Sequence, residues 1–401
     1  MNRTQRLPVM LLAAGTLVLA ACGGAGPATQ ASAAPAAATS AAPAAATSAA
    51  TAAPTAAAAD PCGVPVKSKC DTEAKALTGA GATFPAPLYT KWIEEYYKLT
   101  TVQINYQGVG SGGGIKAFTD KTADFGASDV PLTDAQIGAI TSPFFTFPAA
   151  LGAVVPTYNI PGVTATLKFT PEVLAGVYLE QISKWNDPKI AAENPGVQLP
   201  DMAIRTVHRS DGSGTTGVFT DYLSKVSADW KAKVGSATSV NWPGGVGASG
   251  NAGVAGAVKQ TPGSIGYVEL IYAIQNKLGY GAVKNAAGKY VEASLDSTTK
   301  AAEGVTLPDL GDLKGKQAQI SITNSPNPEA WPISTYTWLL FPKDIADRGK
   351  ATAMIRYFWY STHEGQGFAK ELGYAPLPAN VQKSAEEILR SVTSGGSKVL
   401  K

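Results

Sequence analysis

The stretch Arg209-Ser-Asp-Gly-Ser-Gly-Thr215 sets one guanidinium and one carboxylate beside hydroxyl groups and glycine backbone. The residues that follow it, up to Lys225, have the pattern of a helix. A helix that begins on Ser, Gly and Thr presents unpaired backbone N–H groups and the positive end of its dipole, which suits a tetrahedral oxyanion. We therefore expect an anion site here. Arg209 would engage oxygens in fork geometry, and Asp211 would hold the guanidinium in place.

A second loop of this kind, Gly79-Ala-Gly-Ala-Thr-Phe84, directly precedes a helix that Pro85 opens. Proline is a normal residue at the first position of a helix. The hydroxyl of Thr83 and the neighbouring amides can therefore point at an anion. An ordinary helix cap made by Thr83 is the alternative.

A third loop, Gly108-Val-Gly-Ser-Gly-Gly-Gly114, carries Ser111 at the start of a short helix. With Asp129 about 20 residues further on, the loop formally satisfies the dinucleotide-binding pattern. The helix is too short for a good Rossmann crossover, however, and no Lys-Ser or Lys-Thr follows to make a Walker loop. An anion loop is the better interpretation.

The stretch Asp124-Phe-Gly-Ala-Ser-Asp129 ends a strand with a carboxylate, at the sheet edge where open α/β sheets bind ligands. A carboxylate repels an anion unless the anion brings a proton. A phosphate oxygen that carries hydrogen can donate to Asp129, whereas fully ionised sulfate cannot. The mismatch would cost on the order of several kcal/mol. Asp129 thus favours phosphate over sulfate, unless it merely caps a turn.

Short apolar strands alternate with amphipathic helices from Leu77 onward, which indicates an α/β architecture. Strands are expected at 77–80, 102–107, 124–128, 204–208, 266–269 and 334–341. Helices are expected at 85–99, 115–120, 171–179, 215–226, 345–360 and 379–392.

Composition excludes several classes of function. The chain has 401 residues, enough for two domains, and a net charge of +3, too small to imply nucleic acid. No serine lies in a Gly-x-Ser-x-Gly elbow, and neither His208 nor His363 lies beside a candidate nucleophile. No grouping of His, Asp and Glu has metal-ligand spacing. We expect binding rather than catalysis, with no cofactor and no metal.

The N-terminus has the features of a targeting segment. Arg3 and Arg6 precede a short apolar run that closes on Leu19-Ala-Ala-Cys22. The run is too short for a spanning helix, and the small residues before Cys22 resemble a bacterial lipobox. We expect a signal peptide over 1–21 and a lipid on Cys22, with plain secretory cleavage as the alternative.

The segment 22–59 is almost wholly Ala, Pro, Thr, Ser and Gly after its first residue, so it has too little to bury to offset its ordering entropy. We expect a flexible tether there. Cys62 and Cys70 follow within a cysteine loop over 60–75, and in an oxidising compartment we expect them to form a structural disulfide.

Several separated stretches, in the same order, resemble the phosphate-binding proteins of bacterial phosphate ABC importers. The resemblance covers about residues 76–400. The chain differs from the family pattern at His208, where a second arginine often stands, and at Gly112, often serine. The matching stretches are Leu77-Thr-Gly-Ala-Gly-Ala-Thr-Phe-Pro-Ala-Pro-Leu-Tyr89, Tyr106-Gln-Gly-Val-Gly-Ser-Gly-Gly-Gly114, Asp124-Phe-Gly-Ala-Ser-Asp-Val-Pro-Leu132, Asp211-Gly-Ser-Gly-Thr215, Pro262-Gly-Ser-Ile-Gly-Tyr-Val-Glu269 and Ala330-Trp-Pro-Ile333.

This resemblance implies a type II periplasmic-binding-protein fold with two α/β lobes and the ligand in the cleft between them. Lobe I would comprise 76–153 and 331–401, and lobe II 154–330. Two crossings near 152–156 and 330–333 would form the hinge. The implied phosphate ligands are Thr83, Phe84, Ser111 and Asp129 from lobe I and Arg209, Ser213, Gly214 and Thr215 from lobe II.

The function implied is that of an extracytoplasmic phosphate receptor, anchored to the membrane by its lipid, which delivers phosphate to an ABC permease. We expect a monomer that is not an enzyme and has no nucleic-acid partner. A receptor for another tetrahedral oxyanion or a phosphate sensor is the alternative use of the same fold, and a phosphatase is a more distant one.

Overall fold

The computed structural model describes residues 62–305 and 320–400. The strands are β1 (Ala76–Gly81), β2 (Gln103–Gly108), β3 (Phe125–Ser128), β4 (Phe144–Asn159), β5 (Lys168–Phe169), β6 (Arg205–Arg209), β7 (Val246–Ala248), β8 (Ser264–Glu269), β9 (Gly279–Tyr280), β10 (Ala282–Lys284), β11 (Tyr290–Val291), β12 (Ser334–Pro342), β13 (Thr393–Ser394) and β14 (Ser397–Lys398). The α-helices are α1 (Ala86–Thr100), α2 (Ser111–Thr119), α3 (Asp134–Ala139), α4 (Pro171–Tyr178), α5 (Pro188–Glu193), α6 (Gly214–Val226), α7 (Ala228–Lys233), α8 (Gly250–Gln260), α9 (Leu270–Asn276), α10 (Leu295–Ala302), α11 (Arg348–Thr362) and α12 (Ala379–Ser391). Two 3₁₀ turns follow α11, η1 (Glu364–Phe368) and η2 (Lys370–Leu372).

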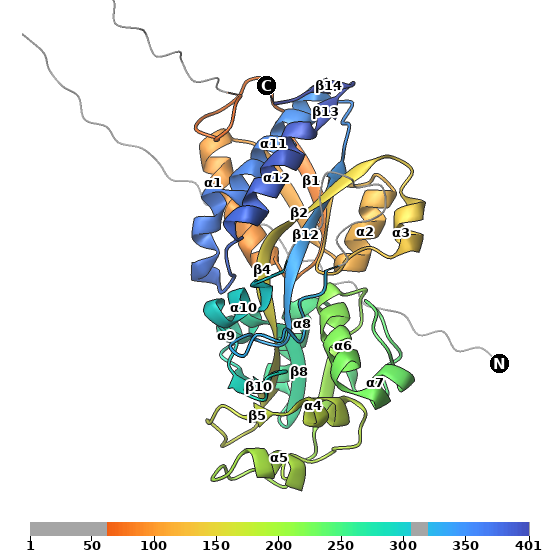
Figure 1. Cartoon of the computed structure of the whole chain (residues 1–401), viewed down its shortest axis with the longest axis vertical. Coiled ribbons are helices and arrows are strands. Elements are labelled where there is room, and N and C mark those ends of the chain that lie inside the picture. Colours follow the sequence, from red (N-terminus) through yellow and green to blue (C-terminus); the bar gives the residue numbers. More distant parts are fainter. Residues whose placement is uncertain (1–61, 306–319, 401) are drawn as a thin grey trace, which may run out of the picture. The chain divides into compact units, whose positions relative to one another are not determined.

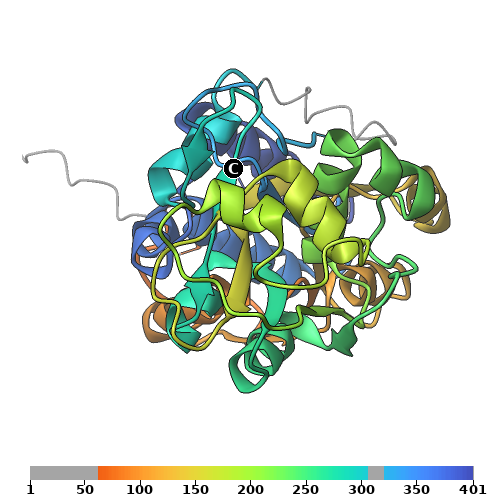
Figure 2. The same cartoon turned by 90° about the horizontal axis from the view of Figure 1, so that it is seen from below.

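One mixed sheet has the strand order β2-β1-β3-β12-β4-β8-β6-β7, with β9 also paired to β4. Within it, β1, β2 and β3 are parallel, and so are β6, β7 and β8. We call these the first and the second strand group. Helix α2 packs on β1 and β3, and α8 packs on β6 and β8. Figure 2, seen from the end that carries α4 and α5, shows helices around the central strands.

Strand β4 connects the two strand groups (Figure 1). Its residues from Phe144 to Ala153 pair with β12, and those from Val154 to Asn159 pair with β8. The sequence did not predict this strand. It contains two prolines, which are normally excluded from central strands. Pro148 is tolerated because the ladder between β4 and β12 has a register shift next to it.

The predicted elements are found close to their expected bounds, with α2 and α11 as exceptions. The sequence predicted a loop over 108–114 and a helix over 115–120, but α2 already begins at Ser111. A Cβ on Gly114 would lie 2.3 Å from the Cα of Gly81, so this glycine allows α2 to pack directly on β1. Helix α11 begins later than predicted, after Asp347, whose side chain accepts a hydrogen bond from the backbone N–H of Lys350.

The loop before β1 is held to α11. Cys62 and Cys70 form a disulfide, and the fully buried Arg356 of α11 pairs with Glu73 through Nε at 3.0 Å. The same guanidinium donates to the carbonyl oxygens of Gly63 and Ser68. The disulfide therefore closes the segment from Cys62 to Glu73 within itself, and the buried ion pair and hydrogen bonds of Arg356 fix it to the body of the protein.

The predicted signal peptide, the lipidated Cys22 and the tether over 22–59 lie outside the described residues. Within residues 62–305 and 320–400, we find no helix that combines the length and apolar character needed to cross a membrane.

Candidate anion-binding site

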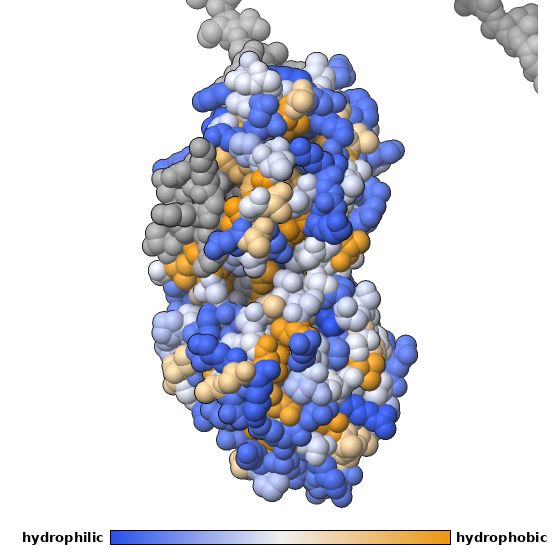
Figure 3. Space-filling view, turned by 90° about the vertical axis from the view of Figure 1, so that its right-hand side faces the viewer, coloured by the Kyte–Doolittle hydropathy of each residue, from blue (hydrophilic) through white to orange (hydrophobic). Residues whose placement is uncertain are grey.

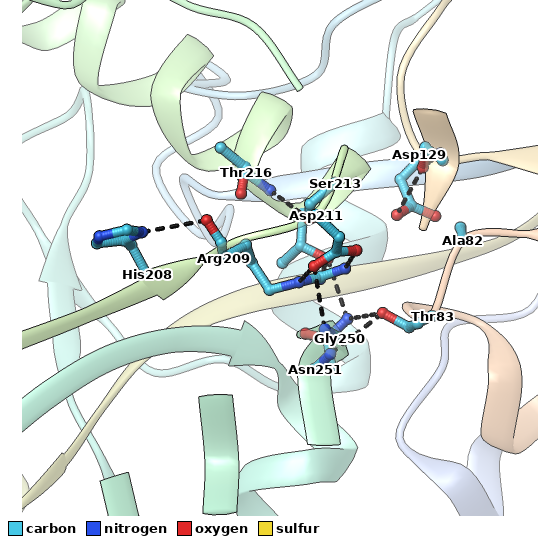
Figure 4. A network of polar contacts seen from close by, with 12 residues as sticks. Ala82, Thr83, Asp129, His208, Arg209, Asp211, Ser213, Thr216, Gly250 and Asn251 are labelled. Atoms are coloured by element: carbon cyan, nitrogen blue, oxygen red, sulfur yellow. Dashed lines mark hydrogen bonds and ion pairs between the residues drawn. The ribbon is translucent and has the colours of Figure 1, made fainter. Parts of the chain in front are cut away.

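The three predicted loops meet at one place, and Figure 4 shows Thr83 of one loop and Arg209 and Ser213 of another beside Asp129. The backbone N–H of Gly112 donates to the carbonyl of Gly212 at 2.8 Å, which joins the third loop to the Arg209 segment. A Cβ on Gly214 would lie only 2.3 Å from Ser111 Oγ and 2.5 Å from Asp129 Oδ2. Residues from both strand groups therefore surround a common point.

Arg209 lies at the end of β6 with its side chain 1% exposed. Its Nε donates to Asp211 Oδ1 at 2.7 Å, its Nη2 donates to Asp211 Oδ2, and its Nη1 donates to Thr215 Oγ1 at 3.4 Å. A guanidinium has five N–H donors. Two of them thus have no partner among the described residues, and they remain available to a ligand.

Helix α6 begins at the same point. The side chain of Ser213 caps it by accepting from the backbone N–H of Thr216 at 3.0 Å. The first two amides of the helix, those of Gly214 and Thr215, lie free beside this cap. The backbone N–H groups of Phe84 and Ser111 likewise make no hydrogen bond within residues 62–305 and 320–400.

Asp129 supplies the carboxylate of the site and is 1% exposed. Its Oδ1 accepts from Thr337 at 3.0 Å and its Oδ2 accepts from Ser111 at 3.4 Å. These partners come from β12 and α2, so the side chain does not simply cap a turn. Burial raises the pKa of Asp129 to about 7, against the lowering effects of the Thr337 hydrogen bond, the Arg209 charge and the Ser111 hydrogen bond.

The carboxylate of Asp211 behaves in the opposite way. Although burial acts to raise its pKa, the hydrogen bonds and the charge of Arg209, with the backbone N–H of Gly250 at 3.0 Å, lower it. Asp211 therefore carries its charge at neutral pH and compensates that of Arg209.

Thr83 lies in the loop before α1 and does not cap that helix, because no side-chain bond caps α1. Its hydroxyl accepts instead from the backbone N–H of Asn251 at 3.2 Å and from Asn251 Nδ2 at 2.9 Å. Its carbonyl accepts from Tyr272 at 2.6 Å. The side chain is held at the site by residues that are far from it in the sequence.

Sequence reasoning missed four residues around the site. Thr337 and Tyr272 lie in apolar stretches that read as core, and nothing local marks them. Asn251 follows Ser249-Gly250, which is a helix-start signal that could have drawn attention to it. Glu269 is fully buried, which raises its pKa well above the ordinary range, and its Oε1 has no hydrogen-bond partner among the described residues.

The chemistry of the site is that of non-covalent anion binding. Among residues 62–305 and 320–400, no group of three or more His, Cys, Asp and Glu could hold a metal ion. His208 stacks on Trp242, with ring centroids 4.9 Å apart, and its Nδ1 lies 3.1 Å from the carbonyl oxygen of Arg209. What remains is a set of N–H and O–H donors beside the carboxyl of Asp129, since Asp211 is already paired with Arg209. That set can enclose an oxyanion that bears a proton.

A cavity of about 380 Å³ lies next to Asp129. Its walls include Val130 and Leu132 on one side and Val218 and Asp221 of α6 on the other. The face that carries α3 and α7 shows a hollow at mid-height (Figure 3).

Comparison with known proteins first defines the class of protein to which the chain belongs. Residues 29–362 match the model of the PBP superfamily domain. Solved structures share the fold. A high affinity periplasmic phosphate-binding protein bound with phosphate has a TM-score of 0.63, at 21% identity, over 78% of this chain and 93% of that one. A human phosphate binding apolipoprotein has a TM-score of 0.65, at 20% identity, over 80% and 99%. The expected two-lobe periplasmic-binding-protein fold is thereby confirmed.

Relatives with higher sequence identity narrow the assignment from the fold superfamily to one family. The phosphate-binding protein PstS of Xylella fastidiosa (strain Temecula1) is 46% identical over 316 residues, which are 79% of this chain and 85% of that protein. PstS of Pasteurella multocida is 42% identical over 331 residues, or 82% and 94%. The chain belongs to the PstS family of phosphate-binding proteins.

Proposed function

We propose that this protein captures inorganic phosphate outside the cytoplasm and delivers it to an ABC permease. The observation that carries the proposal is the buried carboxyl of Asp129, which lies among the hydrogen-bond donors of the site. A protonated oxyanion can donate to Asp129 and accept from every other group. The relatives that bear the phosphate-binding name support the same ligand.

Donors for such a ligand come from both proposed lobes. The free N–H groups of Arg209 supply the only fixed positive charge among the proposed ligands, and Asp211 largely compensates it. Most of the affinity would then come from oriented N–H and O–H dipoles rather than from net charge. The proposed ligand set is Thr83, Phe84, Ser111, Asp129, Arg209, Ser213, Gly214 and Thr215.

Sulfate provides the test of the proposal, because it matches phosphate in shape but carries no proton at neutral pH. Above the pKa of Asp129, at about pH 8.5, two acceptors would then face each other, which costs several kcal/mol, so sulfate should bind at least ~100-fold more weakly at that pH. Isothermal titration with phosphate, arsenate and sulfate measures this ratio. Equal or tighter binding of sulfate would contradict the proposal.

The variant Asp129→Asn tests the same carboxyl by changing the protein instead of the ligand. An amide at this position can donate to sulfate, so discrimination against sulfate should weaken more than phosphate binding does. Unchanged selectivity would show that the carboxyl does not select the ligand.

The remaining parts of the proposal concern location and role. We propose that Cys22 carries a lipid, that the protein acts as a monomeric receptor and that it performs no catalysis. Cys22→Ser should move the protein from the membrane fraction to the soluble fraction. Incubation with a phosphate monoester should release no phosphate.

A further inference from the structure

Asn251 lies at the start of α8, is fully buried and has a fixed side-chain orientation. Its Oδ1 accepts from the backbone N–H of Glu269 at 2.9 Å. Because an N–H must face an acceptor, this contact places the amide oxygen toward β8. The Nδ2 group must then point the opposite way, into the candidate site.

Both hydrogens of Nδ2 are used there. One reaches Thr83 Oγ1 at 2.9 Å and the other reaches Thr215 Oγ1 at 3.0 Å. Thr83 follows β1 of the first strand group, whereas Thr215 and Asn251 follow β6 and β7 of the second. Figure 4 shows Thr83 and Asn251 facing each other. One amide therefore connects a hydroxyl from each side of the site.

Each of these hydroxyls also has a second donor facing it. Thr83 Oγ1 accepts from the backbone N–H of Asn251 at 3.2 Å, and Thr215 Oγ1 accepts from Arg209 Nη1 at 3.4 Å. A hydroxyl oxygen has two acceptor positions and one hydrogen. With both acceptor positions filled, each hydroxyl can only donate. Neither donates to any group among residues 62–305 and 320–400.

We propose that Asn251 is a positioning residue that sets the hydroxyls of Thr83 and Thr215 as donors to the bound anion. This inference rests on the proposed function, because phosphate is the acceptor toward which both hydrogens would point. A hydroxyl group that is free to accept or donate must be fixed in one orientation when the anion binds. Here the orientation of both hydroxyls is already fixed before binding.

The proposal explains why an amide stands at this position. A carboxylate would accept from both hydroxyls and turn their hydrogens away from the ligand. An apolar side chain would leave both hydroxyls without a fixed orientation. Only a group with one acceptor and two donors satisfies Glu269 and both threonines together.

The test uses Asn251→Leu in the full-length protein, with titration of inorganic phosphate. Loss of two preset donors should weaken phosphate binding by roughly 100-fold. The matched control is Asn194→Leu. Asn194 is another buried asparagine whose Nδ2 donates to two oxygens and whose Oδ1 accepts from a backbone N–H, but its two Nδ2 acceptors are backbone carbonyls in and around α5. Its replacement should leave phosphate affinity within about twofold.

A double-mutant cycle separates positioning from general packing. In a Thr83→Val/Thr215→Val background there are no hydroxyls to orient, so adding Asn251→Leu should change phosphate affinity by less than about threefold. An additive loss, or wild-type affinity in the single variant, would overturn the inference. If wild type itself fails to bind phosphate, the proposed function is wrong instead.

Folding of each variant is checked by urea unfolding without phosphate. Should Asn251→Leu not fold, Asn251→Ser replaces it in the same cycle, because serine cannot reach both hydroxyls yet keeps a polar group beside Glu269. It should weaken phosphate binding by roughly tenfold and show the same lack of additivity. Additive behaviour of the serine variant would overturn the inference equally.

Discussion

The protein contains two buried arginine–carboxylate pairs that differ in the contacts that the guanidinium group makes. In the pair Arg356–Glu73 both side chains are 0% exposed, and the guanidinium also donates to backbone carbonyls. In the pair Arg209–Asp211 the arginine side chain is 1% exposed and the aspartate side chain 18%. The contacts of Arg356 go to the loop before β1, whereas Arg209 contacts Asp211 and Thr215 at the candidate site and keeps two N–H groups without a partner among the described residues.

This difference separates a structural arginine from one suited to ligand binding. Burial and an ion pair are common to both, so neither feature identifies a site. The unused donors of Arg209 do, because an unpaired buried N–H is costly unless a ligand completes it. The partner carboxylate matters as well. Asp211 fixes the direction of the guanidinium and leaves its Nη groups directed at the site.

The largest effect is expected from Arg356→Leu. Glu73 would remain buried and unpaired, which should lower the free energy of unfolding by about 3–5 kcal/mol. Urea unfolding measures this loss, and Arg348→Leu at the exposed start of the same helix is the control. Phosphate affinity of the folded fraction should stay within about twofold of wild type. A parallel loss of affinity would remove the distinction between the two pairs.

Asp129 is a third buried carboxyl, and no salt bridge pairs it with an arginine among the described residues. Its pKa in the folded protein is about 7, above the ordinary value of 3.8 for an aspartate. The unfolded chain therefore ionises first as pH rises, and stability relative to Asp129→Asn should fall between about pH 4 and 7, by up to about 4 kcal/mol. Urea unfolding in phosphate-free buffer at several pH values checks this. A difference that does not vary with pH would mean that Asp129 ionises normally.

Arg209→Leu should have a smaller effect on stability but a specific effect on the ligand. Loss of its charge-assisted hydrogen bonds should weaken phosphate binding by roughly 100-fold, or about 3 kcal/mol. Arg205→Leu, an exposed position on the same strand, is the control. If Arg209→Leu kept wild-type affinity, the unused donors would have no functional meaning.

The smallest effect on phosphate affinity is expected at Gly214, where residues that follow the two strand groups are in contact. A Cβ on Gly214 would meet Ser111 Oγ and Asp129 Oδ2, so Gly214→Ala should push these groups apart and weaken phosphate binding by about tenfold. Gly256→Ala is the control, since a Cβ there meets nothing within 4 Å and lies within α8. Calorimetric titration of both variants decides whether contact at Gly214 matters.

The sequence predicted the proposed ligand residues of the site better than the residues that hold them in place. Arg209, Asp211 and Ser213 belong to one short stretch, so their relation could be inferred from spacing alone. Asn251 is 168 residues away from Thr83, and Thr337 is 208 away from Asp129. Contacts over such separations are decided by the strand order, which the pattern of apolar residues does not give.

The fold was predictable where local signals agree and not where packing overrides them. The strands and helices with clear periodicity lie close to their expected bounds. Strand β4 was missed because its prolines argue against a strand, and only the register shift at Pro148 shows how one of them is accommodated. The start of α2 was predicted too late because its glycines were interpreted as part of a loop. The structure shows instead that Gly114 allows α2 to pack closely on β1.

The clamp between Arg356 and the Cys62–Cys70 loop has a mechanical consequence. Any force applied to the chain upstream of Cys62 enters the folded body at α11, which carries this clamp. Helix α11 packs against α12 and η1, and also against β1 and α1, which flank the loop that carries Thr83. A pull on the N-terminal end is thus taken up first at α11, one element away from that loop, rather than at β1 itself.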